Sequence, residues 1–213
     1  MPQPRIKICG LSTAETLGAA IAAHAEYAGL VFHPASPRHV SLALAAQLGA
    51  QAAGRITRVG LFVDADDATI GAAVVAAGLE VLQLHGGESP ARAAELHARF
   101  GIPVWKALAV AARSDLDGAS DYAGAADLVL LDAKTPKGAL PGGMGLSFDW
   151  ALLDGWKAPL AWGLAGGLTP TNVAQAVAAT GAGLVDTSSG VESAPGIKDA
   201  ERISQFCRAA RST

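Results

Sequence analysis

The chain has 213 residues, 51% of them hydrophobic and 16% charged, and it carries a formal net charge of −3. A chain of this length suits one domain, residues 1–213, with a substantial core, and its charge gives no broad basic surface. Charged or histidine residues interrupt the alanine-rich segments before they reach the length of a membrane span, so neither nucleic acid nor a membrane is an expected partner.

Short apolar runs alternate with alanine- and leucine-rich segments along the whole chain. The runs predict eight β-strands, at residues 5–8, 28–32, 57–63, 80–85, 104–108, 128–132, 159–164 and 183–186. The segments between them predict helices at residues 12–24, 41–51, 68–77, 90–100, 169–180 and 200–211, with a short one at 148–153.

Strict alternation of strand and helix predicts a parallel sheet, and eight such units predict a closed TIM barrel, a single-domain (β/α)8 fold of the α/β class. A doubly wound open sheet is the alternative. Against it, residues 9–12 after the first run contain one glycine, whereas a dinucleotide-binding fold carries a glycine-rich fingerprint there.

The seventh and eighth runs each end in a turn of small residues. These turns contain Gly166, Gly167, Ser188, Ser189 and Gly190. Glycine lets backbone N–H groups approach a phosphate, serine adds hydroxyl donors, and a helix opened by each turn adds a favourable dipole. Ordinary turns have the same composition, but the pair after the last two barrel strands predicts a phosphate cup and a phosphorylated small molecule as ligand.

Residues 134–145 form a connection rich in glycine, proline and lysine directly after the sixth run. A connection of this length is long for a compact domain and is typical of a functional loop. The sequence therefore predicts a mobile lid; the alternative is a tolerated surface insertion.

Cys9 ends the first run, at the position where barrel enzymes place catalytic groups. Lys7 and Cys9 share one face of the strand, and Ile6 and Ile8 share the other. A cation one layer below Cys9 should favour its thiolate, which is the form that acts as a base or a nucleophile. The alternative is a small buried hydrophobic residue.

Asp132 ends the sixth run, so a carboxyl group emerges directly from a buried strand. Partial burial would favour its protonated form and suit it to act as a general acid. The alternative is a cap on the following loop. In a closed barrel the first and sixth strands are three steps apart, so we expect Cys9 and Asp132 to face each other across the mouth.

Three further residues predict contacts with a substrate. Arg38 follows the second run and could hold a carboxylate bidentately. His85 could form part of the wall, and Asp186 could bind a polar atom beside the phosphate cup. The alternatives are a solvated Arg38 and an Asp186 that caps the serine turn. The histidines and carboxylates show no metal-ligand spacing.

Six motifs in order resemble those of the phosphoribosylanthranilate isomerases, barrel enzymes of tryptophan biosynthesis. They are Lys-Ile-Cys-Gly at 7–10, Ser-Pro-Arg at 36–38, Gln-Leu-His-Gly at 83–86, Leu-Leu-Asp at 130–132, Ala-Gly-Gly-Leu at 165–168 and Asp-Thr-Ser-Ser-Gly-Val-Glu at 186–192. Two departures are visible: Met144 stands where similar enzymes commonly carry Thr, and Thr187 stands where Val is common.

The resemblance implies an Amadori rearrangement of N-(5'-phosphoribosyl)anthranilate that uses no cofactor. It implies that Cys9 is the general base and Asp132 the general acid. Arg38 would hold the anthranilate carboxylate, and the cup would anchor the phosphate.

Two alternatives remain from other classes. A lyase similar to indole-glycerol-phosphate synthase would need a lysine as acid, for which Lys106 is a candidate, and a noncatalytic phosphate-binding barrel would need neither Cys9 nor Asp132. The cysteines, Cys9 and Cys207, are too few for a disulfide scaffold, and residues 1–5 carry no apolar signal segment. We therefore expect a cytoplasmic enzyme, as a monomer or a homodimer.

Overall fold

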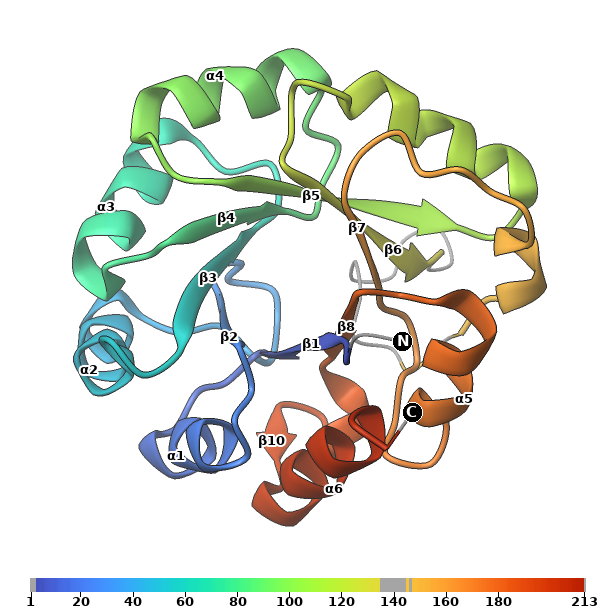
Figure 1. Cartoon of the computed structure of the whole chain (residues 1–213). Coiled ribbons are helices and arrows are strands. Elements are labelled where there is room, and N and C mark those ends of the chain that lie inside the picture. The colour runs from blue at the N-terminus through green and yellow to red at the C-terminus, as the bar shows by residue number, and fades with distance from the viewer. Residues whose placement is uncertain (1–2, 135–144, 146, 213) are drawn as a thin grey trace.

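The computed structural model describes residues 3–134, 145 and 147–212, and it shows a ring of strands enclosed by helices (Figure 1). The ring is a closed barrel in which β1 to β8 follow one another in chain order, and every neighbouring pair is parallel. The predicted TIM barrel is therefore confirmed. The strands are β1 (Arg5–Cys9), β2 (Tyr27–Val31), β3 (Thr57–Phe62), β4 (Val81–Leu84), β5 (Val104–Val110), β6 (Leu128–Ala133), β7 (Trp162–Leu164) and β8 (Leu184–Thr187).

The helices begin and end at residues whose local chemistry favours those positions. Ser89 caps the fourth helix, Pro90 follows it at the first helical position, and Gly101 ends the helix in the left-handed conformation. The α-helices are α1 (Ala14–Ala22), α2 (Leu42–Ala52), α3 (Asp67–Ala77), α4 (Pro90–Phe100), α5 (Val173–Thr180) and α6 (Ala200–Ala210). The 3₁₀ segments are η1 (Arg113–Tyr122), η2 (Trp150–Leu153) and η3 (Ser189–Val191).

Alternating side chains divide the apolar residues into a large outer layer and a smaller inner one. The outer layer packs the strands against the helices and includes Ile6, Ile8 and Leu131. Inside the barrel, Tyr27 and Trp105 pack edge to face with their ring centroids 4.9 Å apart. Cys9 belongs to a third, small cluster inside the barrel. Apolar side chains fill the lower part of the barrel interior, so the polar side chains that point inward lie toward the mouth.

Several predicted boundaries are wrong, for identifiable reasons. The seventh strand begins at Trp162 rather than at Pro159, which has no N–H to donate to a neighbouring strand. The fifth α-helix begins at Val173 rather than at Thr169, because Asn172 accepts the Thr169 N–H and closes a turn before the helix starts.

The structure contains two elements that the sequence did not predict. The segment after β5 forms the 3₁₀ helix η1, and a hairpin of β9 (Glu192–Ala194) and β10 (Ile197–Lys198) follows β8. The predicted short helix at 148–153 is present as η2 over four residues. Most of the predicted lid, residues 135–144, lies outside the described residues, and so does Met144.

The loops after β7 and β8 lie directly against each other. A side chain at Gly190 would place its Cβ 1.9 Å from the carbonyl oxygen of Leu168, so only glycine fits. The hydroxyl of Thr187 donates to that same oxygen at 2.7 Å. Thr187, which stands where Val is common in similar enzymes, therefore ties the two loops together.

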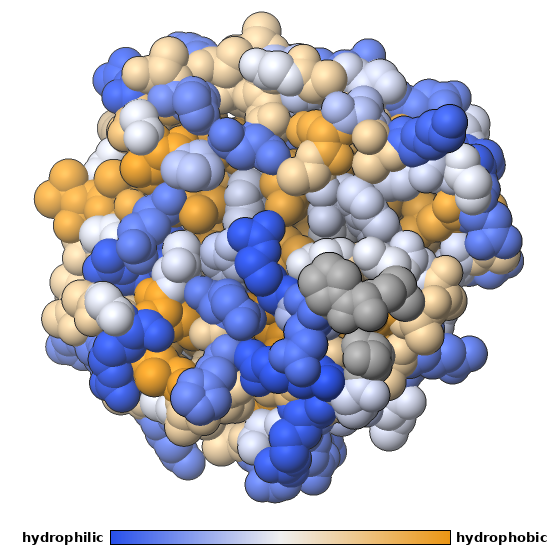
Figure 2. Space-filling view, viewed as in Figure 1, coloured by the Kyte–Doolittle hydropathy of each residue, from blue (hydrophilic) through white to orange (hydrophobic). Residues whose placement is uncertain are grey.

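No helix among the described residues has the length and apolar character needed to cross a bilayer. Figure 2 shows hydrophilic residues over much of the visible face, with hydrophobic ones in separate patches. The large hydrophobic side chains most exposed to solvent are Leu42, Val75 and Ile197, each on a different element. They form no contiguous apolar segment along the chain.

We predict that Thr187→Val lowers the free energy of unfolding by about 1 kcal/mol, and the melting temperature by about 2–4 °C, because the Leu168 carbonyl loses a buried hydrogen bond. Thermal unfolding followed by circular dichroism measures the change. Thr57→Val is the control, since the Thr57 hydroxyl makes no hydrogen bond within the described part of the chain. Equal melting temperatures for Thr187→Val and the wild type would contradict the cross-link.

Candidate active site

An ion pair inside the barrel links its first and last strands below Cys9. Lys7 is fully buried, and its Nζ donates to both carboxylate oxygens of Asp186 at 3.0 Å. The two residues lie opposite each other in the register of β1 and β8. Its charge acts on the neighbouring Cys9, so the predicted cation beneath the thiol is present.

Burial outweighs the effect of that cation on Cys9. Burial raises the pKa of the Cys9 thiol above its usual value, and Lys7 lowers it by a smaller amount. The Asp186 carboxylate, which pairs with Lys7, adds a smaller upward contribution to the pKa because it disfavours a nearby thiolate. Lys7 thus favours the thiolate of Cys9 as expected, but burial outweighs it and the pKa of Cys9 lies above its usual value.

Burial also changes the two charged partners. It raises the pKa of Asp186 above its usual value, although Lys7 opposes the change. Burial alone would lower the pKa of Lys7, but the attraction of Asp186 and Cys9 raises it overall. Lys7 thus stays protonated and remains a fixed positive charge within the barrel.

Asp132 contacts His85 at the mouth. The Nε2 of His85 lies 3.2 Å from Oδ2 of Asp132, and Oδ1 of Asp132 accepts the backbone N–H of Ala133 at 2.8 Å. The amide Nε2 of Gln83 lies 3.1 Å from Nδ1 of His85. With the Gln83 amide in this orientation, its nitrogen donates to Nδ1, and Nε2 of His85 carries the proton that points at Asp132. Asp132 thus lies beside His85 and accepts the N–H of Ala133, the last residue of β6, an arrangement compatible with an acid and with a structural role.

Asp186 connects the two halves of this cluster. The nearby charges that act on its carboxyl include Lys7, Asp132 and His85. Because β8 lies between β1 and β7 in the ring, Asp186 stands between Cys9 on β1 and Asp132 on β6. The structure therefore brings Cys9, Asp132, His85 and Asp186 together, as the positions of their strands predicted.

Arg38 makes the predicted bidentate contact with a carboxylate, but this carboxylate belongs to the protein. Its Nε and Nη2 donate to the two carboxylate oxygens of Glu192 at 2.7 and 2.8 Å. Both side chains are buried, and burial would raise the pKa of Glu192, but Arg38 and Lys198 lower it below its usual value. Arg38 is thus held in a fixed orientation rather than solvated.

The predicted phosphate cup has a suitable backbone but a different use of its serine. Gly166 and Gly167 have φ of 80° and 64°, in the left-handed region. The backbone N–H groups of Gly166, Gly167, Ser188 and Ser189 donate to no acceptor among the described residues. The Ser188 hydroxyl donates to the carbonyl oxygen of Cys9 at 3.1 Å, so its hydrogen is already used. The cup can therefore offer backbone N–H groups, but not the Ser188 hydroxyl as predicted.

The predicted helix dipoles contribute less than expected. The loop after β8 leads into η3, which has only three residues, and α5 begins six positions beyond Gly167. The donors of the cup are consequently single N–H groups in tight turns rather than the end of a long helix.

Lys106, the candidate acid of the lyase alternative, points away from the barrel interior. It shares a face of β5 with Val104 and lies opposite Leu84 and Val129, all in the helix-facing layer. Its Nζ pairs with Glu88 at 2.9 Å, and both side chains are buried. Lys106 therefore cannot act on a substrate in the mouth.

The sequence interpretation gave no role to three residues that belong to the site. Gln83 and Glu192 lie within quoted motifs, so their positions were visible although their partners were not. Lys198 lies on β10, for which no apolar run gave a signal. Among the described residues, no group of three or more His, Cys, Asp or Glu side chains could hold a metal ion.

The chain is similar to known proteins along nearly its whole length. A model of the family described as N-(5'phosphoribosyl)anthranilate (PRA) isomerase matches residues 6–209. An N-(5'-phosphoribosyl)anthranilate isomerase from Rhodopseudomonas palustris is 56% identical over 209 residues, which cover 98% of this chain and 96% of that protein. One from Cereibacter sphaeroides is 56% identical over 210 residues, which cover 97% of this chain and 98% of that protein.

Solved structures of isomerases from this family are similar to this chain in fold. A phosphoribosyl anthranilate isomerase from Thermotoga maritima has a TM-score of 0.88 and 33% identity, over 99% of this chain and 100% of that one. Another such isomerase, in complex with reduced 1-(o-carboxyphenylamino)-1-deoxyribulose 5-phosphate, has a TM-score of 0.86 and 31% identity, with the same coverage.

We predict that alkylation of Cys9 by iodoacetamide accelerates about tenfold per pH unit between pH 7 and 9, because the thiolate is the reacting form and burial raises the pKa of Cys9. Cys207→Ala protein, analysed by mass spectrometry, isolates the Cys9 signal. N-acetylcysteine in the same buffers is the control for the reagent. A rate that stays constant over this range would show that Cys9 is already ionised at pH 7 and would contradict the effect of burial.

Proposed function

The chain belongs to the N-(5'-phosphoribosyl)anthranilate isomerase family of tryptophan biosynthesis, and from this premise we propose that Cys9 and Asp132 are its general base and general acid. The reaction is the Amadori rearrangement of N-(5'-phosphoribosyl)anthranilate to 1-(2-carboxyphenylamino)-1-deoxyribulose 5-phosphate. It moves protons and rearranges bonds within one molecule, so the acid and the base are the reactive groups that it requires.

The acid acts first in the proposed mechanism. Asp132 gives its proton to the furanose ring oxygen, the bond from that oxygen to C1 breaks, and C1 and the anthranilate nitrogen form an iminium. The resulting carboxylate of Asp132 is stabilised by two donors, the Ala133 N–H and the Nε2 of His85. These donors favour the product side of the proton transfer.

The base acts on the iminium. Cys9 as thiolate removes the proton from C2, which gives an enolamine, and tautomerisation of the enolamine gives the ketone. A thiol whose pKa is raised is a strong base once ionised, and the fixed charge of Lys7 stabilises the thiolate during the step. The observation that carries the proposal is this pairing of Cys9 and Asp132 around Asp186 at one barrel mouth.

In the proposal, separate groups of the protein bind the two anionic ends of the substrate. Arg38, fixed by Glu192, takes the anthranilate carboxylate, and backbone N–H groups of Gly166, Gly167, Ser188, Ser189 and Gly190 take the phosphate. His85 and Asp186 line the space between them. Binding at both ends positions the reacting carbons between the acid and the base.

The assembly and the location of the enzyme are part of the proposal. Cys9 and Cys207 are free and buried, which supports a reducing compartment, and we place the enzyme in the cytoplasm. It acts as a monomer or a homodimer on a small phosphorylated substrate. A solved structure shows monomers generated from the dimeric isomerase of Thermotoga maritima.

Incubation of the purified protein with N-(5'-phosphoribosyl)anthranilate tests the function directly. Loss of the substrate fluorescence, with formation of the carboxyphenylamino-deoxyribulose phosphate seen by mass spectrometry, is the expected result. A folded protein that leaves the substrate fluorescence unchanged would contradict the function.

Cys9→Ala should lower turnover by at least about a thousandfold, because the base of the second step is lost. The Michaelis constant should change little, since the anionic ends of the substrate are bound elsewhere. Cys207→Ala is the matched control and should keep wild-type turnover, because Cys207 lies on α6 in the outer layer. Near wild-type turnover of Cys9→Ala would assign Cys9 to packing alone.

Asp132→Asn should lower turnover by about two to four orders of magnitude, because the amide keeps the shape and the Ala133 contact but has no transferable proton. Folding, checked by circular dichroism, should be retained. Should the folded variant keep most of its turnover, Asp132 is only a loop cap and the acid is another residue, first of all Asp186.

A further inference from the structure

Two buried cations share one carboxylate beside the barrel mouth. Glu192 accepts from Arg38 with both oxygens, and its Oε1 also accepts from Nζ of Lys198 at 2.6 Å. Arg38, Glu192 and Lys198 are all buried. Two positive charges and one negative charge leave this trio with a net charge of +1. A buried excess charge is unfavourable by itself and favours an anion nearby.

Lys198 also holds the loop that forms the phosphate cup. Its Nζ donates to the carbonyl oxygen of Ser188 at 2.9 Å and to the Ser188 hydroxyl at 3.1 Å. An ammonium has three N–H groups, and Glu192 and Ser188 accept all three. Lys198 therefore acts on a ligand through its charge and through Ser188, not by a hydrogen bond of its own.

The contacts continue from the cup to the base. The Ser188 hydroxyl accepts from Lys198, and its own hydrogen goes to the carbonyl oxygen of Cys9. One chain of hydrogen bonds thus runs from Arg38 through Glu192 and Lys198 to Ser188 and Cys9. Its members come from β1, the loop after β2, the loop after β8, and the β9–β10 hairpin.

We propose that Lys198 is a positioning residue that couples the carboxylate-binding end of the site at Arg38 to the phosphate-binding end at Ser188. The inference rests on the proposed function, which assigns those two ends to the substrate. It adds that the hairpin after β8 sets the distance between them. Losing Lys198 therefore weakens binding at both ends, although Lys198 touches neither anion.

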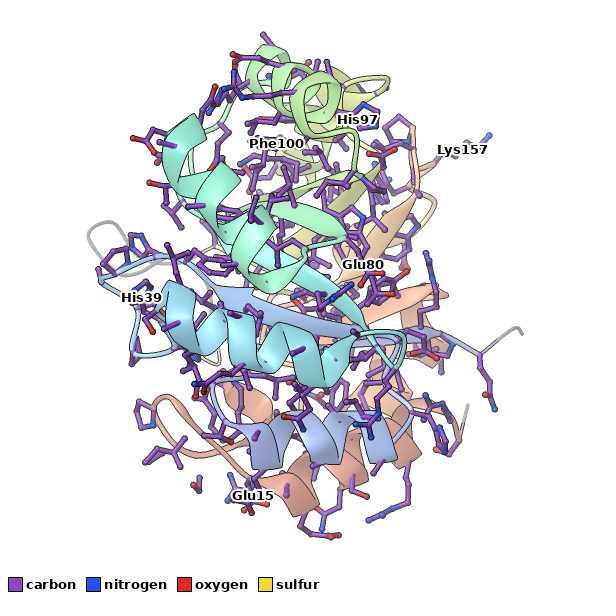
Figure 3. All side chains as sticks on the ribbon, turned by 90° about the vertical axis from the view of Figure 1, so that its left-hand side faces the viewer. Glu15, His39, Glu80, His97, Phe100 and Lys157 are labelled. Carbon is purple, nitrogen blue, oxygen red and sulfur yellow. The ribbon has the colours of Figure 1, made fainter. Side chains whose placement is uncertain are left out.

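Lys198→Met is a suitable variant because it leaves one positive and one negative charge paired in the trio. Glu192 keeps its bidentate contact with Arg38, so no lone buried charge is created. Lys157→Met is the matched control: Lys157 is exposed, and Figure 3 places it at the opposite end of the barrel from His39, the neighbour of Arg38. Circular dichroism and the melting temperature show whether each variant is folded.

Inhibition of turnover by two separate fragments of the substrate measures binding at each end of the site independently. Inorganic phosphate reports the cup, and anthranilate reports the carboxylate end. Lys198→Met should weaken inhibition by phosphate about tenfold, as expected for the loss of a charged hydrogen-bonding partner, and inhibition by anthranilate about threefold. Arg38→Met should weaken inhibition by anthranilate but change that by phosphate less than about twofold, and Lys157→Met should change neither.

The outcomes separate this inference from the proposed function. A wild-type protein without turnover, or one that neither fragment inhibits, contradicts the proposed function. With an active and inhibited wild type, a folded Lys198→Met that loses sensitivity to one fragment only, or to neither, overturns the coupling. Should Lys198→Met fail to fold, Lys198→Gln removes the charge, keeps two N–H donors, and is subject to the same criteria.

Discussion

The ion pair between Lys7 and Asp186 is the interaction on which the rest of the site depends. It joins β1 to β8, so it lies where the last strand of the barrel meets the first. An isolated lysine in this position would be strongly destabilised, because the surrounding barrel interior is apolar. The pair therefore fixes the register at the closure of the barrel and keeps a charge beneath Cys9 at the same time.

That arrangement explains why the site is built from strands far apart in the chain. Lys7 and Asp186 are 179 residues apart in sequence, and so are Cys9 and Ser188. Parallel strands in a closed ring bring all their carboxyl ends to one mouth, so a base, an acid and an anion cup can come from separate units. Rigid strands position the reacting groups, and the loops carry the anion contacts.

The sequence predicted the barrel and most of the site because both depend on local patterns. Buried strands need apolar runs, and α4 was predicted to the residue because Ser89, Pro90 and Gly101 mark its ends. The raised pKa of Cys9 was not predictable, because Lys7 was visible in the neighbouring sequence whereas the burial that outweighs it, and the nearby Asp186, both result from barrel closure. The hairpin with Lys198 was missed because its short strands lie at the surface and carry no apolar run.

The outward direction of Lys106 shows how strand pleating restricts the chemistry open to this fold. Neighbouring positions on β5 differ by one residue in sequence but by a whole layer in space: Trp105 packs inside the barrel, and Lys106 lies under the helices. A lysine at position 107, which lies opposite the inward-facing Leu130, would enter the interior. To gain a related activity, such a barrel therefore needs the functional group at a strand position whose side chain points inward. The same group one residue away on the same strand points toward the helices.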